Sequence, residues 1–275
     1  MQELNLNQLS IKVLDIARAA GSSILDIYHD DTIKVETKND GSPVTSADKE
    51  AHQIIKAGLE KLPQDIPILS EEEEISSENL DLFWLVDPLD GTKEFINRTD
   101  EFTVNIALVL DSRPVMGVVI APAIEEEFLG ILNEGSYKIT ENKKFSIKPK
   151  SKVGDICTIT TSKSHKSDLD EAFLKEANKR FRELNLKQAG SSLKLCRVAE
   201  GAADIYSRLG PTYQWDIAAG QVIAEAAGAV LKSTNGKDLS YKFDSKTKNP
   251  FFYCAGDAEF NWQDLLNRAL SNSKD

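Results

Sequence analysis

Residues 83–95, FWLVDPLDGTKEF, place two aspartates at the end of an apolar run. An ionised carboxylate is costly in apolar surroundings unless an opposite charge neutralises it, so few folds accept this arrangement. The run predicts a buried strand that stops near Pro88, because proline cannot donate a hydrogen bond to a neighbouring strand. Asp87 then lies at the strand end, where ligand crevices of α/β sheets form. Asp90 is placed to be the N-cap of a helix that starts at Gly91, and capping alone would also explain it.

Two other acidic residues have a similar setting. Glu71 directly follows a short apolar strand predicted within residues 66–70, IPILS, and Asp216 stands at the start of another predicted helix. Asp216 too would suit a simple N-cap, and the rest of the glutamate run 71–74 is typical of a solvated surface. Taken together, these acidic residues form a set of oxygen donors without histidine or cysteine, which favours Mg²⁺, Mn²⁺ or Ca²⁺ over zinc. The set consists of Glu71, Asp87, Asp90 and Asp216.

The hydrophobic periodicity predicts a mixed α and β chain in two parts. Hairpins of an antiparallel sheet dominate before residue 150, and strands alternate with helices after it. We therefore expect two tightly joined lobes, an α+β lobe over residues 1–150 and an α/β lobe over residues 151–275. The predicted helices span 6–29, 46–61, 168–181, 192–203, 215–228 and 257–270. The predicted strands span 32–38, 66–70, 102–111, 113–122, 126–132, 135–147, 156–162, 204–209, 229–233 and 251–256, besides the strand of the opening stretch.

The charge balance restricts the partners. The formal net charge is −11, from 44 acidic and 33 basic side chains, which argues against binding a nucleic acid polymer through a basic patch. An anionic substrate would also be repelled unless bound cations reverse the local sign. No apolar run is long enough to span a bilayer, and the first residues lack the features of a secretory signal, so we expect a cytoplasmic protein.

Other catalytic and redox patterns are absent from the sequence. It contains no P-loop motif, and none of its three histidines has a serine in the setting of a hydrolase elbow. Three cysteines, Cys157, Cys196 and Cys254, follow no zinc-site spacing, so we expect buried free thiols.

Two segments carry a family resemblance. WLVDPLDGTKEF and WDIAAGQVIAEAAGAVL resemble the signature segments of the inositol monophosphatase superfamily of lithium-sensitive, magnesium-dependent phosphatases. SPVTSAD, ILSEE, FTVNIALV, GVVIAP, SKSH, GSSLKLCRVAEGAADIYSRLGPTYQWD and GKDL are similar too, in the family's order. The resemblance implies a layered αβαβα sandwich with the active site between two lobes. Within the superfamily the chain is most similar to the 3′(2′),5′-bisphosphate nucleotidases of bacterial sulfate assimilation.

The resemblance implies a metal site on the acidic residues named above. Glu71, Asp87 and the backbone carbonyl of Leu89 would hold one Mg²⁺ ion, and Asp87, Asp90 and Asp216 would hold a second. The implied cofactor is thus Mg²⁺, as two or three ions. Shared carboxylates at rigid strand ends and helix starts would fix the ions close enough to grip one phosphate.

The implied reaction is hydrolysis of a phosphate monoester by in-line attack of water. Thr92 matches the family's proposed proton acceptor, positioned by Asp48. Taken alone, Asp48 also fits a capping box with Thr45. Backbone N–H groups at Gly91 and Thr92 would hold the phosphate.

A bisphosphate substrate needs contacts for its second phosphate. Similar positions in the bisphosphate nucleotidases fall on Ser191, Lys194 and Arg208, and residues 162–165 are a weaker candidate. Simpler roles remain open: Ser192 as a helix cap, Lys194 on a solvated helix face and Arg208 in an ion pair at a strand end. The full set of residues expected to contact substrate is Glu71, Leu89, Asp90, Gly91, Thr92, Ser191, Lys194, Arg208 and Asp216.

The activity implied is removal of the 3′-phosphate from adenosine 3′,5′-bisphosphate to leave AMP. One alternative is an inositol or other sugar monophosphatase, because the metal site is common to the fold. Lys194 favours the nucleotide, since a monophosphate has no second phosphate to place there. The other alternative is a non-catalytic regulator that binds metal or phosphate, which the intact set with Asp48 and Thr92 argues against. The resemblance also allows a peripheral position on the inner face of the membrane, and the oligomeric state stays open.

Overall fold

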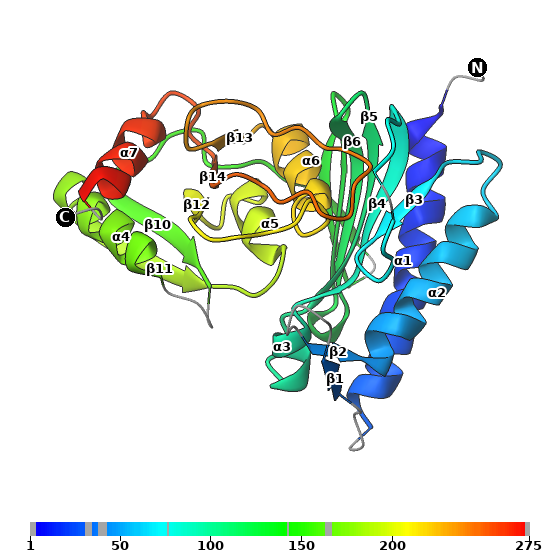
Figure 1. Cartoon of the computed structure of the whole chain (residues 1–275). Coiled ribbons are helices and arrows are strands. Elements are labelled where there is room, and N and C mark those ends of the chain that lie inside the picture. The colour runs from blue at the N-terminus through cyan, green and yellow to red at the C-terminus, as the bar shows by residue number, and fades with distance from the viewer. Residues whose placement is uncertain are drawn as a thin grey trace.

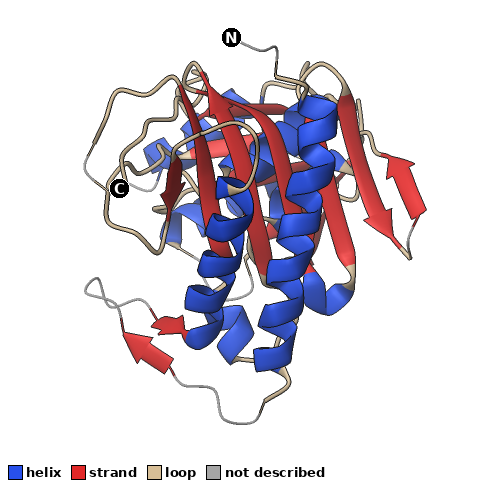
Figure 2. Cartoon of the chain, turned by 90° about the vertical axis from the view of Figure 1, so that its right-hand side faces the viewer, coloured by secondary structure: helices blue, strands red, loops and turns tan. Residues whose placement is uncertain are grey.

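The computed structural model describes residues 4–30, 35–37, 43–75, 77–141, 143–162 and 167–272. Helices and sheets alternate across the molecule in five layers (Figure 1). The first layer is the helix pair α1 (Leu6–Tyr28) and α2 (Ser46–Glu60), which lie side by side across one face of a large sheet (Figure 2). The middle layer is α5 (Leu193–Ala199) and α6 (Ala218–Ala227), and the last is α4 (Asp168–Arg180) and α7 (Trp262–Asn272). This order confirms the predicted αβαβα sandwich.

The second and fourth layers are the two main sheets. The larger is seven-stranded in the order β3-β4-β5-β6-β7-β8-β9, antiparallel except for the parallel pair β3 and β4. Its strands are β3 (Ile68–Ser70), β4 (Leu82–Asp90), β5 (Thr103–Leu110), β6 (Arg113–Ala121), β7 (Glu126–Ile131), β8 (Gly135–Thr140) and β9 (Lys143–Ser146). The smaller is five-stranded in the order β11-β10-β12-β14-β13. Its strands are β10 (Ile156–Thr161), β11 (Glu183–Gln188), β12 (Ile205–Arg208), β13 (Val230–Ser233) and β14 (Phe252–Ala255).

The strand β4 is apolar along almost its whole length because both faces of the sheet are covered. Phe83 and Leu85 point into the core beneath α5 and α6, while Trp84 and Val86 point into the core beneath α1 and α2. Alternate residues of a strand face opposite sides of the sheet, so two buried faces require an unbroken apolar run. The aspartates at the end of β4 are thereby built into a rigid, dry part of the fold.

Helix α6 approaches the large sheet closely because two glycines lie beneath it. A Cβ atom on Gly117 of β6 would lie 2.4 Å from Val222 and 2.5 Å from the carbonyl oxygen of Ala219. A Cβ atom on Gly130 of β7 would lie 2.6 Å from the Cα atom of Ile223. The missing side chains therefore fix the height of α6 above the sheet, and with it the position of the turn that precedes α6.

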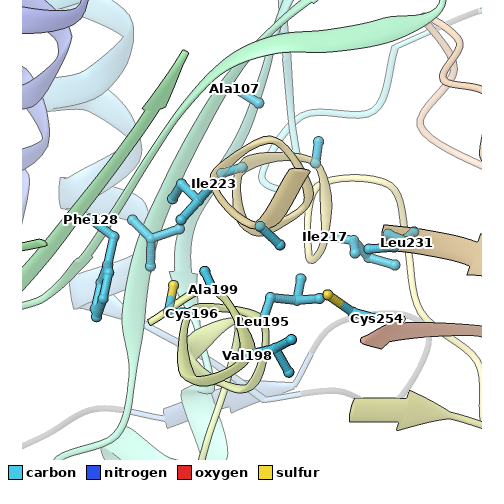
Figure 3. Close-up of a cluster of buried hydrophobic side chains, with 14 of the residues drawn as sticks. Ala107, Phe128, Leu195, Cys196, Val198, Ala199, Ile217, Ile223, Leu231 and Cys254 are labelled. Atoms are coloured by element: carbon cyan, nitrogen blue, oxygen red, sulfur yellow. The ribbon is translucent and has the colours of Figure 1, made fainter. Parts of the chain in front are cut away.

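One hydrophobic core joins the two halves of the sequence. Phe128 and Ala107 of the large sheet pack with Leu195 and Ile223 of the middle helices, and the cluster continues to Cys254 of the smaller sheet (Figure 3). The large sheet ends at Ser146 and the smaller sheet begins at Ile156. This core contains residues from both sides of residue 150. The division into two lobes at residue 150 therefore stays a prediction.

Most of the predicted elements are present, and several boundaries were wrong. The strand β4 does not stop at Pro88 but continues to Asp90. The edge strand β11, which parallels β10, was not predicted, because it follows α4 after a short turn and most of its side chains are exposed. The last helix begins at Trp262 rather than at residue 257. The predicted strand at 32–38 is present in part, as β1 (Val35–Thr37). It pairs antiparallel with β2 (Pro43–Thr45), which lies in the predicted turn. The rest of this region lies outside the described residues.

Two short helical elements lie outside the main layers. The 3₁₀ turn η1 (Pro122–Ile124) follows β6, and the helix α3 (Thr92–Ile96) follows β4. The predicted free thiols are confirmed, since all three cysteines are buried and unbridged. Within the described ranges, no helix has both the length and the apolar character needed to cross a bilayer.

The close contact of α6 predicts a large effect of a single methyl group. Gly117→Ala should lower the free energy of unfolding by about 1–3 kcal/mol, because the new methyl group overlaps the backbone of α6. Gly154→Ala is the matched control, since a Cβ atom there meets nothing within 4 Å. Urea denaturation measures both variants. Equal stability of the two proteins would show that α6 can move away from the sheet without cost.

Candidate active site

Three carboxylates from separate parts of the chain converge at one end of the large sheet. Glu71, Asp87 and Asp216 each offer an oxygen atom, and these atoms all lie within 4.8 Å of one another. Glu71 directly follows β3, and its backbone N–H donates to the carbonyl oxygen of Val86 at 3.1 Å. Because β3 and β4 are parallel neighbours, their carboxyl ends meet at the same edge and bring Glu71 beside Asp87. We call Glu71, Asp87 and Asp216 the carboxylate cluster.

Asp216 is supplied by a tight turn in front of α6. Its Oδ2 atom accepts a hydrogen bond from the backbone N–H of Tyr213 at 3.0 Å. The carbonyl oxygen of Gln214 accepts from the N–H groups of Ile217 and Ala218, which starts the helix. The N-cap residue is Ile217, so the alternative that Asp216 is a simple N-cap was wrong.

The end of β4 departs from the prediction in a way that matters for the site. The pairing of β4 with β5 shifts register between Asp87 and Asp90, so the chain bulges through Pro88 and Leu89. Asp87 Oδ1 accepts from the backbone N–H of Leu89 at 3.1 Å, which fixes that carboxylate. Asp90 was predicted as the N-cap of α3, but that position belongs to Gly91 in a left-handed conformation with φ of 90°. The side chain of Asp90 is therefore available for other contacts.

Asp90 lies outside the carboxylate cluster and is held by a chain of buried polar groups. Asn105 Nδ2 donates to Asp90 Oδ2 at 3.4 Å, and Ser192 Oγ donates to Asn105 Oδ1 at 2.6 Å. Ser192 Oγ also lies 2.9 Å from Thr103 Oγ1. Ser192 occupies the N-cap of α5 without a capping hydrogen bond, so its side chain orients Asn105 rather than the helix. Asn105 is not among the residues predicted for the site, although a lone amide inside the apolar strand TVNIALVL is a usable signal.

Burial shifts the acidity of these carboxyl groups. Desolvation raises the pKa of Asp90 to about 6, and the positive charge of Lys194 partly opposes that rise. Desolvation, followed by the negative charges of Asp90 and Glu71, raises the pKa of Asp216 well above its ordinary value. Like charges crowded in a dry site disfavour ionisation, and bound cations would reverse the effect. The all-oxygen donor set and its mutual repulsion together fit a divalent cation.

Asp48 serves two structures at once. Its Oδ2 atom accepts from the backbone N–H of Thr45 at 2.7 Å and from Thr45 Oγ1 at 2.6 Å, which confirms the predicted capping box of α2. Its Oδ1 atom accepts from Thr92 Oγ1 at 3.1 Å. The Asp48 carboxyl is buried, and desolvation raises its pKa, although the hydrogen bonds from Thr45 act in the opposite direction. The structure therefore places Asp48 and Thr92 together, as the resemblance implied, at the start of α3.

A cavity of about 130 Å³ opens beside the carboxylates. Asp90, Asp216, Lys194 and Arg208 all line it. One cavity therefore holds acidic residues and two cationic side chains, although the protein is acidic overall. The remaining lining residues are Gly91, Glu94, Ser162, Ser191, Ser192, Leu195, Tyr206, Thr212, Ile217 and Phe252.

Lys194 is buried, so its alternative role on a solvated helix face was wrong. Its side chain is only 7% exposed, and Nζ lies 3.4 Å from the carbonyl oxygen of Ala189 and 5.7 Å from the ring centre of Tyr206. Desolvation lowers the pKa of Lys194, while the charge of Asp90 opposes that change. A buried ammonium group with one long hydrogen bond retains donor capacity for an anion.

The other two residues predicted to contact phosphate, Arg208 and Ser191, differ in how many of their hydrogen-bond donors are already used within the protein. Arg208 ends β12 and donates from Nη2 to the carbonyl oxygen of Pro211 at 2.9 Å, while its Nε atom is buried without a hydrogen bond to the described chain. Ser191 instead donates its hydroxyl to the backbone carbonyls of Asp90 and Glu101, at 2.8 and 2.9 Å. That hydroxyl ties the start of α5 to the end of β4. Of residues 162–165, Ser162 lines the cavity and the others lie outside the described residues.

Both the sequence and the structure are similar to those of known proteins. The profile of the inositol monophosphatase family matches residues 6–273. The 3′(2′),5′-bisphosphate nucleotidase CysQ of Buchnera aphidicola is 38% identical over 272 residues, covering 93% of this chain and 99% of the relative. CysQ of Escherichia coli K12 is 41% identical over 248 residues, covering 88% and 97%. The crystal structure of CysQ from Bacteroides thetaiotaomicron superposes with a TM-score of 0.80 at 36% identity, covering 94% and 100%.

The raised pKa of Asp90 predicts how stability depends on pH in the metal-free protein. A carboxyl whose pKa rises on folding stabilises the fold at low pH, and that contribution is lost as pH rises through about 6. With EDTA present, Asp90→Asn should therefore melt at a higher temperature than the wild type at pH 7.5 and at a similar temperature near pH 4.5. Asp81→Asn, on the exposed surface, should show no such pH dependence relative to the wild type. A melting temperature of Asp90→Asn below that of the wild type at pH 7.5 would show that the ionised carboxylate does not destabilise the fold.

Proposed function

The chain belongs to the inositol monophosphatase family, and we propose that it hydrolyses the 3′-phosphate of adenosine 3′,5′-bisphosphate to give AMP and phosphate. The relatives from Buchnera aphidicola and Escherichia coli support a nucleotide bisphosphate as substrate, because both are named 3′(2′),5′-bisphosphate nucleotidase and align with nearly the whole chain. The observation that carries the proposal is the cavity, which joins the metal-binding candidates to Lys194 and Arg208. A substrate with two phosphates matches a cavity lined both by candidate metal ligands and by two cationic side chains.

The residues that would hold the metal are the carboxylate cluster, Asp90 and the carbonyl of Leu89. Divalent cations at such a site supply Lewis-acid chemistry, since they polarise a phosphoryl oxygen and make a water molecule a better nucleophile. In this proposal the protein carboxylates balance the charge of Mg²⁺. Asp87 and Asp90 lie on either side of the bulge at the end of β4, and Asp87 belongs to the carboxylate cluster while Asp90 lines the adjoining cavity.

Thr92 and Asp48 would manage the proton of the attacking water. The hydroxyl of Thr92 already donates to Asp48, so as its oxygen accepts a proton from the attacking water its own proton can pass to the Asp48 carboxylate. The new P–O bond forms in line with the bond to the ribose O3′, which breaks, and O3′ takes up a proton from a solvent water molecule. Backbone N–H groups at Gly91 and Thr92 would hold the phosphate during this displacement. No residue becomes phosphorylated in this scheme.

Lys194 and Arg208 would hold the 5′-phosphate. Both side chains line the cavity, and a charge-assisted hydrogen bond to phosphate is stronger than a neutral one. Ser191 lines the same cavity, and its hydroxyl holds the end of β4 by hydrogen bonding to the backbone carbonyls of Asp90 and Glu101.

A panel of phosphate esters tests the proposed activity. We expect phosphate release from adenosine 3′,5′-bisphosphate with Mg²⁺ to exceed release from AMP and from inositol 1-phosphate by at least tenfold, because two phosphates are bound rather than one. EDTA should abolish the activity. Inositol 1-phosphate as the best substrate would replace the nucleotide assignment by a monophosphatase, and full turnover in EDTA would refute the metal-dependent mechanism.

Removal of one buried charge tests how the second phosphate is held. Lys194→Met keeps most of the unbranched side chain but removes the ammonium group, and it should lower kcat/KM for adenosine 3′,5′-bisphosphate by about ten- to a hundredfold, the value of a charge-assisted hydrogen bond. Hydrolysis of adenosine 3′-monophosphate should change little, because that substrate places no phosphate there. Arg208→Gln should act in the same direction.

The control is Lys179→Met, which removes an exposed positive charge from α4 far from the cavity lining. It should leave both substrates unaffected. Equal losses on both substrates in Lys194→Met would mean that Lys194 acts on the metal-binding carboxylates through Asp90 rather than on the second phosphate.

A further inference from the structure

Glu71 and Asp216 belong to segments that are distant in sequence. Another stretch of the chain forms hydrogen bonds with both the segment after Glu71 and the turn that carries Asp216. Residues 241–249, here called the strap, form an irregular stretch between β13 and β14. One side of the strap contacts the segment that follows Glu71, and the other side contacts the turn that carries Asp216. We propose that the strap sets the spacing of Glu71 and Asp216, and that Gln214 is the positioning residue that fixes the strap.

Gln214 binds the strap through its whole amide group. Its Nε2 atom donates to the carbonyl oxygens of Lys242 and Asp244, both at 2.9 Å, and its Oε1 atom accepts from the N–H of Lys242 at 2.6 Å. The side chain is fully buried. Both amide protons and the acceptor oxygen are thus used, so the strap has one defined position relative to Gln214. Because Asp216 lies two residues further on in the same tight turn, the position of the strap is tied to that carboxylate.

The opposite side of the strap holds the segment after Glu71. The N–H of Glu78 donates to the carbonyl oxygen of Phe243 at 3.0 Å, and Ser245 Oγ donates to the carbonyl oxygen of Ile75 at 3.0 Å. The ring of Phe243 packs edge-on against Phe83 of β4, with centres 5.4 Å apart. Ile75 is four residues from Glu71, so this contact limits how far the glutamate can move from the end of β4.

The need for such a clamp follows from charge. When they are ionised and no cation lies between them, the carboxylates repel one another, and this repulsion pushes the Glu71 segment away from the Asp216 turn. A clamp that resists the repulsion keeps the cluster in a binding geometry and lowers the cost of binding a cation. Groups behind metal ligands commonly change metal affinity by about 10–100-fold when they are removed.

The inference rests on the proposed metal-dependent function, and calorimetric titration with Mg²⁺ separates the two. In Gln214→Met the side chain keeps its approximate volume but loses all three hydrogen bonds. We expect Mg²⁺ to bind EDTA-treated and dialysed Gln214→Met about 10–100-fold more weakly than the wild type. Activity of this variant should approach the wild-type kcat once Mg²⁺ is saturating.

The control separates positioning from stability. Ser136→Ala also removes a buried hydrogen bond, from Ser136 Oγ to the carbonyl oxygen of Ile223 at 2.6 Å, but it does not touch the strap. It should lower the melting temperature and leave Mg²⁺ affinity unchanged. If Gln214→Met proves unfolded, Ser245→Ala replaces it, since loss of the single contact with Ile75 should weaken Mg²⁺ binding about fivefold.

Each outcome has one meaning. Weaker Mg²⁺ binding in Gln214→Met or Ser245→Ala, with unchanged binding in Ser136→Ala, supports the clamp. Wild-type affinity in a folded Gln214→Met, or in Ser245→Ala if that variant is used, overturns it while the metal-dependent function stands. Failure of the wild type itself to bind Mg²⁺ overturns both.

Discussion

Repulsion between carboxylates is the constraint on which the rest of the structure depends. Three acidic groups from three segments lie within 4.8 Å of one another, and a fourth, Asp90, lines the adjoining cavity. Such a cluster persists only when packing and hydrogen bonds hold the three segments in place against the repulsion between their carboxylates. The parallel ends of β3 and β4, the close seat of α6 on two glycines and the strap all supply that stiffness. The same groups that make the site costly to build make it attractive to cations.

Asp48, at the start of α2, has both a structural role and a role in the proposed chemistry. Asp48 closes the capping box with one oxygen and holds Thr92 with the other. The helix start therefore fixes the orientation of the threonine, and the threonine in turn satisfies a buried carboxylate. A polar network of this kind is strong when complete and costly when one member is missing. Substitution of Asp48 would thus disturb α2 and the site together, whereas Thr92 can be altered with less effect on α2.

The sequence was informative where periodicity and motif agreed. Helix α1 and the hairpin of β5 and β6 follow from apolar spacing alone. Positions at strand ends and helix starts indicated the three carboxylates that the structure brings together, and the family resemblance assigned them to a metal site. Local rules failed at Pro88, because a bulge lets β4 continue past a residue that normally ends a strand. They also failed for Gln214, since nothing in YQWD indicates that the amide binds a backbone segment almost thirty residues later. Contacts between distant segments leave little trace in a single sequence.

The shared core also relates the fold to the order in which the chain is synthesised. The inner face of the large sheet, with Phe83, Leu85 and Phe128, is complete once residue 146 has left the ribosome. The helices that cover it, α5 and α6, begin only at Leu193 and Ala218. Roughly seventy residues must therefore emerge while this apolar surface faces water, which is the condition under which nascent chains associate wrongly or bind chaperones. Burial of the sheet on both faces makes the site rigid. The same burial requires α5 and α6, which are synthesised after the sheet, so folding of this region has to wait for them.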